Sequence, residues 1–447
     1  MKTHDYWKEY QELKLANNED AIMHLDPFGK LATDYITNSD AYLNFAVGSI
    51  RSGKTIAAIV AFLRYIKESP YTMFAMAGKS LKSLKRNVLK PMRGIMRYFG
   101  IKYYYHKKEE ELDILNFGKK KTIVLYGIEK KGSDEPIKGS TYAGALLDEV
   151  TVMDAEGARM MISRNSQGDS RIFLTCNPGN PNNFVYQEYV NDKELINKGH
   201  VKVWNFLLED NPSLSHAYVE HIKNIYPKDS IFYKRNILGL WASGQGLIYS
   251  KLDDNNFYDT QRPLDYYDYL EIGSDYGSSS TTCFNLVGIK EFDDHNEYDI
   301  IAEDGYNAEK EGVSLTDDEI VDMVVRMQDK YQLGMYDVIY PSHDAKSLKT
   351  ALQKDERVEM DIHTFTPNTL ECISEISSLI YKNYLRIYTG CVNTIHCLRG
   401  YEWDSKAASR GEDKPRKVDD HYADSIRAPI MEHLYNGEPV GFLLGLG

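Results

Sequence analysis

The stretch Gly48-Ser-Ile-Arg-Ser-Gly-Lys-Thr55 decides the fold of the first half of the chain. It follows the apolar run Tyr42-Leu-Asn-Phe-Ala-Val47 and leads into Ile56-Ala-Ala-Ile-Val-Ala-Phe-Leu63, so a strand, a glycine loop and a helix are predicted in that order. Glycines let such a loop curl until its N–H groups face phosphate oxygens. In that arrangement Lys54 reaches the β- and γ-phosphates of a nucleotide, and the Thr55 hydroxyl can hold Mg²⁺.

An ordinary glycine turn between a strand and a helix is the alternative interpretation, and the apolar flanks on both sides disfavour it. The loop therefore supplies the candidate ATP-binding residues, which are Gly48, Ser49, Arg51, Ser52, Gly53, Lys54 and Thr55.

An acidic pair completes this predicted nucleotide site. The run Ala143-Gly-Ala-Leu-Leu-Asp-Glu-Val150 is typical of a buried strand that ends in two carboxylates. We expect Asp148 to hold Mg²⁺ through water and Glu149 to polarise the attacking water. A strand that ends in a solvated acidic turn is the alternative when the pair is considered without the loop.

A third strand, Arg171-Ile-Phe-Leu-Thr-Cys-Asn-Pro178, ends where a doubly wound sheet places its ligands. Thr175 and Asn177 are therefore candidates to sense the γ-phosphate. The turn-forming residues that follow leave a simple turn as the alternative. Three arginines that follow the acidic pair are candidate arginine fingers or surface charges, and they are Arg159, Arg164 and Arg171, the first residue of this strand.

Length and composition limit the possible architectures. A chain of 447 residues is too long for one hydrophobic core, so two domains are expected. The composition shifts near residue 250, which divides the chain into residues 1–250 and 251–447. The polar amino terminus and the absence of a long apolar run predict neither signal peptide nor membrane span, and hence a cytoplasmic protein. Five scattered cysteines indicate reduced thiols rather than a zinc site.

The charge distribution limits the mode of nucleic-acid binding. A net charge of −13 argues against a protein that coats nucleic acid non-specifically. Basic residues are nevertheless concentrated between Lys79 and Arg97, where a solvated helix face and a DNA-contacting face are both open interpretations.

The second half predicts a different sheet. Runs at residues 270–277, 281–289 and 297–303 are separated by short turns, so an antiparallel meander is expected, followed by a helix at residues 317–331 and further strands. Asp275 lies on the first of these strands among apolar neighbours, where an ionised carboxylate is costly unless it is paired or bound to metal. Asp344 follows a later strand, at residues 336–340.

A late helix is predicted to add further carboxylates. In the segment Lys417 to Arg427, the i, i+4 spacing of Asp420 and Asp424 places both on one helix face, with His421 beside them. If Asp275, Asp344 and the late helix converge, two Mg²⁺ or Mn²⁺ ions could activate water and stabilise the leaving oxygen of a phosphodiester. A turn residue, an N-cap and a solvated helix face are the respective alternatives.

Together these motifs resemble the large terminase subunit of tailed bacteriophages. The resemblance covers nearly the whole chain and rests on the phosphate loop, Leu146-Leu-Asp-Glu149, Thr175-Cys-Asn-Pro178 and the carboxylates of the second half. It implies an α/β fold: an amino-terminal P-loop ATPase domain of the RecA/ASCE type with a mostly parallel sheet, and a carboxy-terminal RNase H-like nuclease domain.

The resemblance also implies functions for these residues. Lys54, Thr55 and Asp148 bind ATP and Mg²⁺, Glu149 is catalytic, and Thr175 and Asn177 couple hydrolysis to movement. Asp275, Asp344 and Asp424 are the nuclease metal ligands, with Asp420 and His421 as flanking candidates. The implied partners are double-stranded DNA, a small terminase subunit and the portal protein of the prohead. Copies of this chain are expected to assemble as a ring on the portal, and no membrane partner is implied.

Two other functions are compatible with parts of the sequence. One is a helicase-like or repair ATPase with an attached nuclease. The other is an ATP-gated DNA-binding module that does not cleave. A two-lobe helicase requires a second RecA-like lobe, whereas the sequence after residue 250 predicts a meander.

Overall fold

The computed structural model describes residues 27–129, 132, 135–277, 280–342 and 344–437. The polar amino terminus on which the predicted location rests, residues 1–10, lies outside the described residues. Among the described residues, no helix is long and apolar enough to cross a membrane.

The chain forms two compact units. The first unit contains the described residues up to 223 together with residues 233–242, and the second contains residues 224–232 and the described residues from 243 to 437. The chain thus crosses between the units three times near residues 223–243. The single boundary that the sequence predicts at residue 250 lies close to the last crossing.

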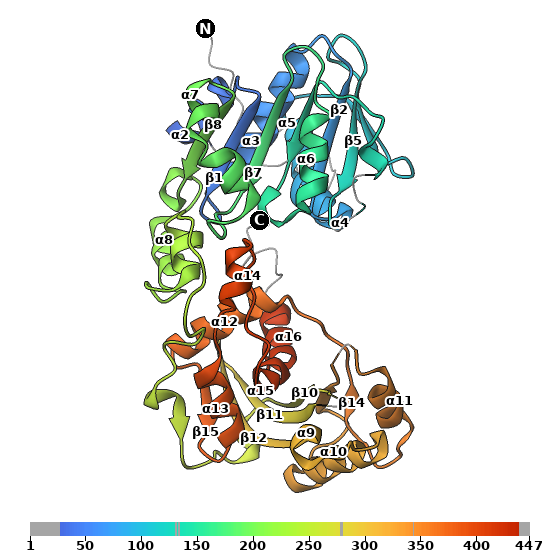
Figure 1. Cartoon of the computed structure of the whole chain (residues 1–447), viewed down its shortest axis with the longest axis vertical. Coiled ribbons are helices and arrows are strands. Elements are labelled where there is room, and N and C mark those ends of the chain that lie inside the picture. Colours follow the sequence, from blue (N-terminus) through green and yellow to red (C-terminus); the bar gives the residue numbers. More distant parts are fainter. Residues whose placement is uncertain (1–26, 130–131, 133–134, 278–279, 343, 438–447) are drawn as a thin grey trace. The chain divides into compact units, whose positions relative to one another are not determined.

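An eight-stranded sheet is the centre of the first unit, with the strand order β3-β4-β5-β2-β6-β7-β1-β8 (Figure 1). All pairs are parallel except those of β3 with β4 and β4 with β5, so the predicted mostly parallel sheet is confirmed. The strands are β1 Leu43–Gly48, β2 Met73–Gly78, β3 Tyr103–His106, β4 Glu111–Ile114, β5 Lys121–Gly127, β6 Gly144–Leu147, β7 Arg171–Cys176 and β8 Val201–Phe206.

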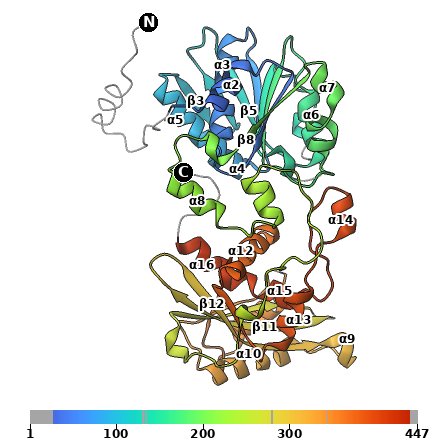
Figure 2. The ribbon, with the colours of Figure 1, turned by 90° about the vertical axis from the view of Figure 1, so that its left-hand side faces the viewer.

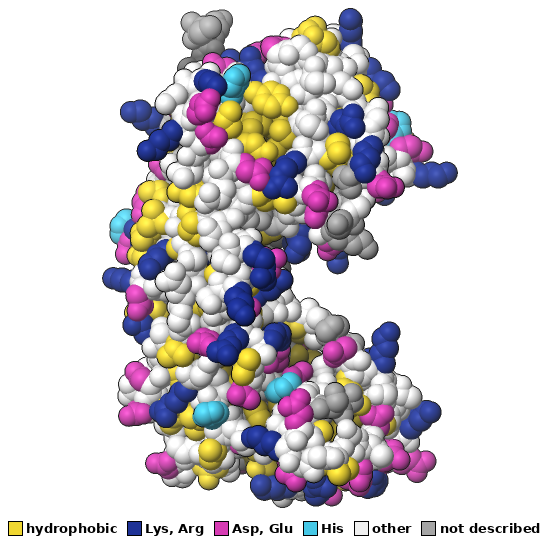
Figure 3. All heavy atoms as spheres, in the orientation of Figure 1, with side chains coloured by type: hydrophobic (Ala, Val, Ile, Leu, Met, Phe, Trp, Pro, Cys, Tyr) yellow, Lys and Arg dark blue, Asp and Glu magenta, His cyan; other side chains and the backbone are white. Residues whose placement is uncertain are grey.

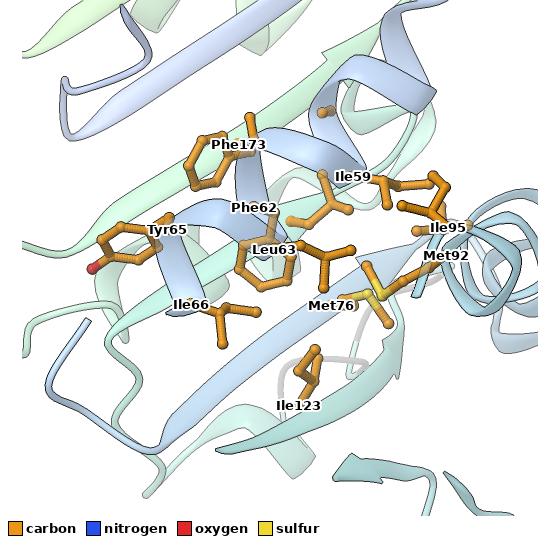
Figure 4. Close-up of a cluster of buried hydrophobic side chains, with 14 of the residues drawn as sticks. Ile59, Phe62, Leu63, Tyr65, Ile66, Met76, Met92, Ile95, Ile123 and Phe173 are labelled. Atoms are coloured by element: carbon orange, nitrogen blue, oxygen red, sulfur yellow. The ribbon is translucent and has the colours of Figure 1, made fainter. Parts of the chain in front are cut away.

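Helices cover both faces of this sheet, as Figure 2 shows. On one face α3 packs through an apolar stripe that includes Ile59, Phe62 and Ile66, against Phe173 of β7 (Figure 4). Phe62 also contacts Phe74 of β2. This burial positions the phosphate loop, because the loop joins β1 to α3 directly. The helices are α2 Lys30–Asn38, α3 Lys54–Glu68, α4 Leu81–Leu84, α5 Lys90–Tyr98, α6 Ala155–Ser163, α7 Lys193–Asn197 and α8 His216–Lys223.

The second unit has a seven-stranded sheet with the order β14-β13-β10-β11-β12-β15-β9. Its centre is the predicted antiparallel meander of β10, β11 and β12, and parallel strands flank it. The strands are β9 Phe257–Tyr258, β10 Tyr269–Asp275, β11 Thr281–Glu291, β12 Asn296–Asn307, β13 Val338–Tyr340, β14 Asp361–Ile362 and β15 Leu385–Tyr388. This topology is not that of a second RecA-like lobe, which disfavours the two-lobe helicase interpretation.

Two hydrophobic clusters hold helices on opposite faces of the second sheet. One joins the sheet to α12, α13, α15 and α16, and the other joins it to α10 and α11. The helices are α9 Ala308–Glu311, α10 Asp317–Tyr331, α11 Lys346–Lys354, α12 Thr369–Tyr381, α13 Val392–Gly400, α14 Ser405–Ser409, α15 His421–Ser425 and α16 Arg427–Gly437.

Candidate functional site

The candidate nucleotide site lies at the carboxyl ends of β1, β6 and β7, three adjacent strands of the first sheet. The loop between β1 and α3 turns through Gly53, whose φ of 83° lies in the left-handed region that favours glycine. Lys54 begins α3 and is buried, and its Nζ donates a hydrogen bond to the Ser49 carbonyl at 3.0 Å. The ammonium therefore lies over the loop that the sequence predicts as the phosphate-binding element.

Burial lowers the pKa of Lys54, and this effect is opposed by Cys176 and by the carboxylates of Glu149 and Asp148. The structure thus brings the predicted lysine and both predicted acids into one electrostatic cluster. A cationic side chain held in a buried site is poised to interact with an anionic ligand such as a phosphate.

A network of hydroxyl groups joins the acids to the loop. Thr175 Oγ1 donates to Asp148 Oδ1 at 2.7 Å and accepts a hydrogen bond from the Glu149 backbone N–H at 3.1 Å. Thr55 Oγ1 donates to the same Asp148 oxygen at 3.4 Å. One carboxylate oxygen of Asp148 thus accepts hydrogen bonds from a hydroxyl group of the loop and from one of β7. Thr175 is therefore part of the site.

The acids themselves are in unusual environments. Burial, together with the neighbouring charge of Glu149, raises the pKa of Asp148. Glu149 has a φ of 56°, a left-handed conformation that is uncommon outside glycine and that concentrates at functional sites. Hydroxyl and carboxylate oxygens are the ligands that Mg²⁺ prefers, so Thr55 and Asp148 fit the ion that the sequence predicts here.

The other predicted residues of this site have structural contacts. Ser52 Oγ donates to the Ser49 carbonyl at 2.9 Å and closes the loop. The Asn177 carbonyl accepts a hydrogen bond from Thr151 Oγ1 at 3.4 Å, and its side-chain oxygen is buried without a hydrogen-bond partner within the described chain. Arg159 pairs with Glu188, and Arg171 lies over the Tyr65 ring.

Two hydrogen bonds that hold the phosphate loop could not be predicted from the sequence. Asn211 Nδ2 donates to the Arg51 carbonyl at 2.7 Å, which holds a residue whose φ is 57°. The π-helical segment Tyr233–Ile237 returns to the first unit, and there the Asn236 carbonyl accepts a hydrogen bond from the Ile50 N–H at 3.1 Å. Both contacts join residues far apart in the chain, so no local spacing reveals them.

The same returning segment also contacts the end of β7. The Ala242 N–H donates to the Gly179 carbonyl at 3.1 Å, and Arg235 Nε donates to the Ala242 carbonyl at 2.8 Å. Residues 233–242 therefore touch both the phosphate loop and the turn that follows Thr175 and Asn177.

Some of the basic side chains between Lys79 and Arg97 form contacts within the first unit. Lys85 pairs with Glu110, while Arg93 and Arg97 both donate to the Tyr103 hydroxyl. On the face of the molecule in Figure 3, Lys and Arg side chains are interspersed with Asp and Glu.

The candidate metal residues of the second unit lie around α15. Gly273 of β10 lets this helix approach closely, because a Cβ atom there would lie 1.9 Å from the Ser425 carbonyl oxygen. Asn285 of β11 fixes the helix from the next strand, since its Nδ2 donates to Ser425 Oγ at 2.7 Å. As a result, His421 Nδ1 donates to Asp275 Oδ2 at 2.7 Å.

Asp420 and Asp424 share one cation, as their predicted common face allows. Lys417 Nζ lies 2.7 Å from Asp420 Oδ2 and 2.9 Å from Asp424 Oδ2. Arg427 contacts the other oxygen of Asp424 at 2.7 Å. Burial raises the pKa of Asp424, and the hydrogen bond to Asp275 raises the pKa of His421. Lys417 was not among the predicted residues of this site, because it meets these carboxylates only through the bend that precedes α15.

Asp344 is exposed just beyond β13 and does not cap α11, whose N-cap is Ala345. Within the described part of the chain, no three His, Cys, Asp or Glu side chains are grouped closely enough to hold a metal ion. The set of Asp275, Asp344 and Asp424 therefore stays a prediction. The oxygens of Asp420 and Asp424 that converge on one ammonium nitrogen nevertheless have the chemistry that Mg²⁺ and Mn²⁺ require.

Comparisons with known proteins are consistent with this geometry. A protein-family model described as "Terminase large subunit, T4likevirus-type, N-terminal" matches residues 45–253 of this chain. The large terminase of a thermophilic bacteriophage has 26% sequence identity and a TM-score of 0.80, and the match covers 92% of this chain and 100% of that one.

Two nucleotide complexes of the same thermophilic phage protein are also similar. The ADP complex has a TM-score of 0.77 and the ATP-γ-S complex one of 0.76, each with 26% identity over 90% of this chain and 98% of that one. No curated protein sequence matches the chain.

Proposed function

Because this chain belongs to the large terminase subunits of tailed bacteriophages, we propose that it packages viral double-stranded DNA, with an ATPase in its first unit and an endonuclease in its second. The observation that supports this most strongly is the cluster of Lys54, Thr55, Asp148 and Thr175 at the carboxyl edge of the first sheet. The thermophilic phage terminase, whose nucleotide complexes match 90% of this chain, binds ADP and ATP-γ-S.

In the proposed hydrolysis, the N–H groups of the loop and Lys54 bind the β- and γ-phosphates of ATP. Thr55 and Asp148 would hold Mg²⁺, which would neutralise the charge that develops on the phosphates. Glu149 orients the attacking water and accepts its proton. Thr175 connects the two acids, so a change at either one is transmitted to β7 and to the turn that contacts Ala242.

In the proposed cleavage, Asp275 of β10 and Asp424 of α15 would hold divalent ions, together with Asp344. When bound, two such ions activate water and stabilise the leaving oxygen of a phosphodiester. His421 holds the Asp275 carboxylate by a hydrogen bond and thereby fixes its orientation. Double-stranded DNA is the proposed substrate of this site.

The proposal includes the partners of a packaging machine. A small terminase subunit, the portal protein of the prohead and further copies of this chain in a ring are the expected protein partners. The expected location is the cytoplasm of the host cell, with transient docking on the prohead.

Two conservative substitutions test whether the ATPase lies in the first unit and the nuclease in the second. Glu149→Gln is expected to reduce ATP turnover at least about 100-fold while Mn²⁺-dependent plasmid cleavage persists. Asp275→Asn is expected to abolish cleavage while ATP turnover persists. Glu156→Gln and Asp329→Asn, at exposed positions of α6 and α10, serve as matched controls. Normal cutting by Asp275→Asn would refute the nuclease assignment.

A further inference from the structure

A lysine bridges two carboxylates, one at the N-cap of α15 and one within that helix. The Lys417 ammonium contacts Asp420 at 2.7 Å and Asp424 at 2.9 Å. The two carboxylate side chains are only 8% and 19% exposed, whereas the lysine side chain is 68% exposed. The cation therefore comes from the solvent side and neutralises charges that the fold has largely buried.

The surrounding charges show what Lys417 contributes. Arg427 of α16, itself buried, pairs with Oδ1 of Asp424, and His421 is directed to Asp275. Lys417 is the basic residue that contacts Oδ2 of both Asp420 and Asp424. These are the oxygens on which a divalent ion between the two residues would depend.

The segment just before Lys417 is attached to the backbone around Trp403. Pro415 forms a bridge with Trp403, and the Arg416 N–H donates to the Glu402 carbonyl at 2.9 Å. Lys417 to Asp419 then form a bend, in which Asp419 has a φ of 50°, before α15 begins. The lysine thus projects from a short bend between an anchored segment and the helix.

We propose that Lys417 is a displaceable internal cation that competes with divalent metal for Asp420 and Asp424. The inference rests on the proposed nuclease function. An ammonium group and a divalent ion repel each other at close range, so simultaneous contact of both with the same carboxylate oxygens is unfavourable. A mostly exposed lysine forms a weak ion pair and is readily displaced, so it stabilises the metal-free site and leaves when metal binds.

The test is Mn²⁺ binding by isothermal titration calorimetry on the full chain without nucleotide. Lys417→Ala and Lys417→Gln are expected to lower the Kd for Mn²⁺ by about twofold to fivefold, because the competitor is removed. Lys414→Ala is the matched control, since Lys414 is similarly exposed and pairs only with Glu412 among the ion pairs of this segment. An unchanged or higher Kd in both Lys417 variants would overturn the proposal.

A further variant separates failure of this inference from failure of the nuclease assignment. Asp424→Asn is expected to abolish the Mn²⁺ signal. If it does so while the Lys417 variants bind Mn²⁺ like the natural chain, the metal site stands and the competition is refuted. If Asp424→Asn binds Mn²⁺ normally, the metal site itself is refuted, and the competition with it. Thermal unfolding gives a second measure: Mn²⁺ should raise the melting temperature of Lys417→Ala more than that of the natural chain.

Discussion

The Thr175 hydroxyl at the end of β7 forms hydrogen bonds with both acidic residues of the nucleotide site. It donates to Asp148 and accepts from the backbone of Glu149. A buried carboxylate that loses such a donor keeps its desolvation cost, and a buried N–H that loses its acceptor is left unsatisfied. The catalytic geometry therefore depends on a residue of the neighbouring strand as well as on the acids themselves.

We predict that Thr175→Val, which preserves shape but removes the hydroxyl, lowers the kcat for ATP about 10-fold to 100-fold. The KM should change less, because Lys54 and the loop still bind the phosphates. Steady-state ATPase assays check the split, and Thr175→Ser should retain most of the activity. Equal kcat values for Thr175→Val and the natural chain would show that the hydroxyl has no role in turnover.

Residues whose chemistry imposes a fixed spacing were predictable from the sequence. Lys54 and Thr55 follow the glycines at the distance that a phosphate loop needs, and the structure places them together with Asp148 and Glu149. Asn211 and Lys417 were not predictable in this way. Asn211 contacts a loop 160 positions away in the chain, and Lys417 acquires its role only through the fold of the bend before α15.

Helix ends were predictable where a capping signal exists. The helix Asp317–Tyr331 was predicted with the bounds that the structure shows, and Thr316 and Glu319 form a capping box at its start. The helix predicted from Lys417 instead begins at His421, because Asp419 adopts a left-handed conformation that interrupts it. The antiparallel hairpin of β3 and β4 was not anticipated, since its short strands lack a long apolar run.

Helix α12 carries a carboxylate in an unfavourable environment. Burial, with a smaller effect of Glu371, raises the pKa of Glu375 to about 7, against 4.5 for an ordinary glutamate, and Lys382 opposes the shift. Below both pKa values, Glu375 is protonated in the folded and the unfolded state alike. As the pH rises from 4.5 to 7 only the unfolded state releases its proton, so stability falls across this window and then levels off.

We therefore predict that Glu375→Gln stabilises the second unit at pH 8 by about 1–3 kcal/mol, and that the gain disappears near pH 4.5. Thermal unfolding of the full chain at several pH values measures the difference. Glu356→Gln, at an exposed position after α11, is the control. A gain that does not depend on pH would mean that the ionisation of Glu375 is not its origin.

At the scale of the whole molecule, each unit has its own hydrophobic cores. The clusters around α3 and α6 contain residues of the first unit alone, and those around α10 and α12 contain residues of the second unit alone. The proposed ATP-binding and metal-binding residues divide in the same way. A ligand that binds only the folded form of one unit should therefore stabilise that unit.

We predict that ADP with Mg²⁺ raises the melting temperature of the first unit and that Mn²⁺ without nucleotide raises that of the second. At 100 times its Kd a ligand contributes about 2.7 kcal/mol, which for units of this size corresponds to a shift of about 5–10 °C. Scanning calorimetry measures the transitions, and hydrogen exchange in α3 and α10 assigns them. Lys54→Ala should remove only the ADP effect and Asp424→Asn only the Mn²⁺ effect. Loss of both effects in either variant would show that the two sites are not independent, because each substitution lies in a single unit.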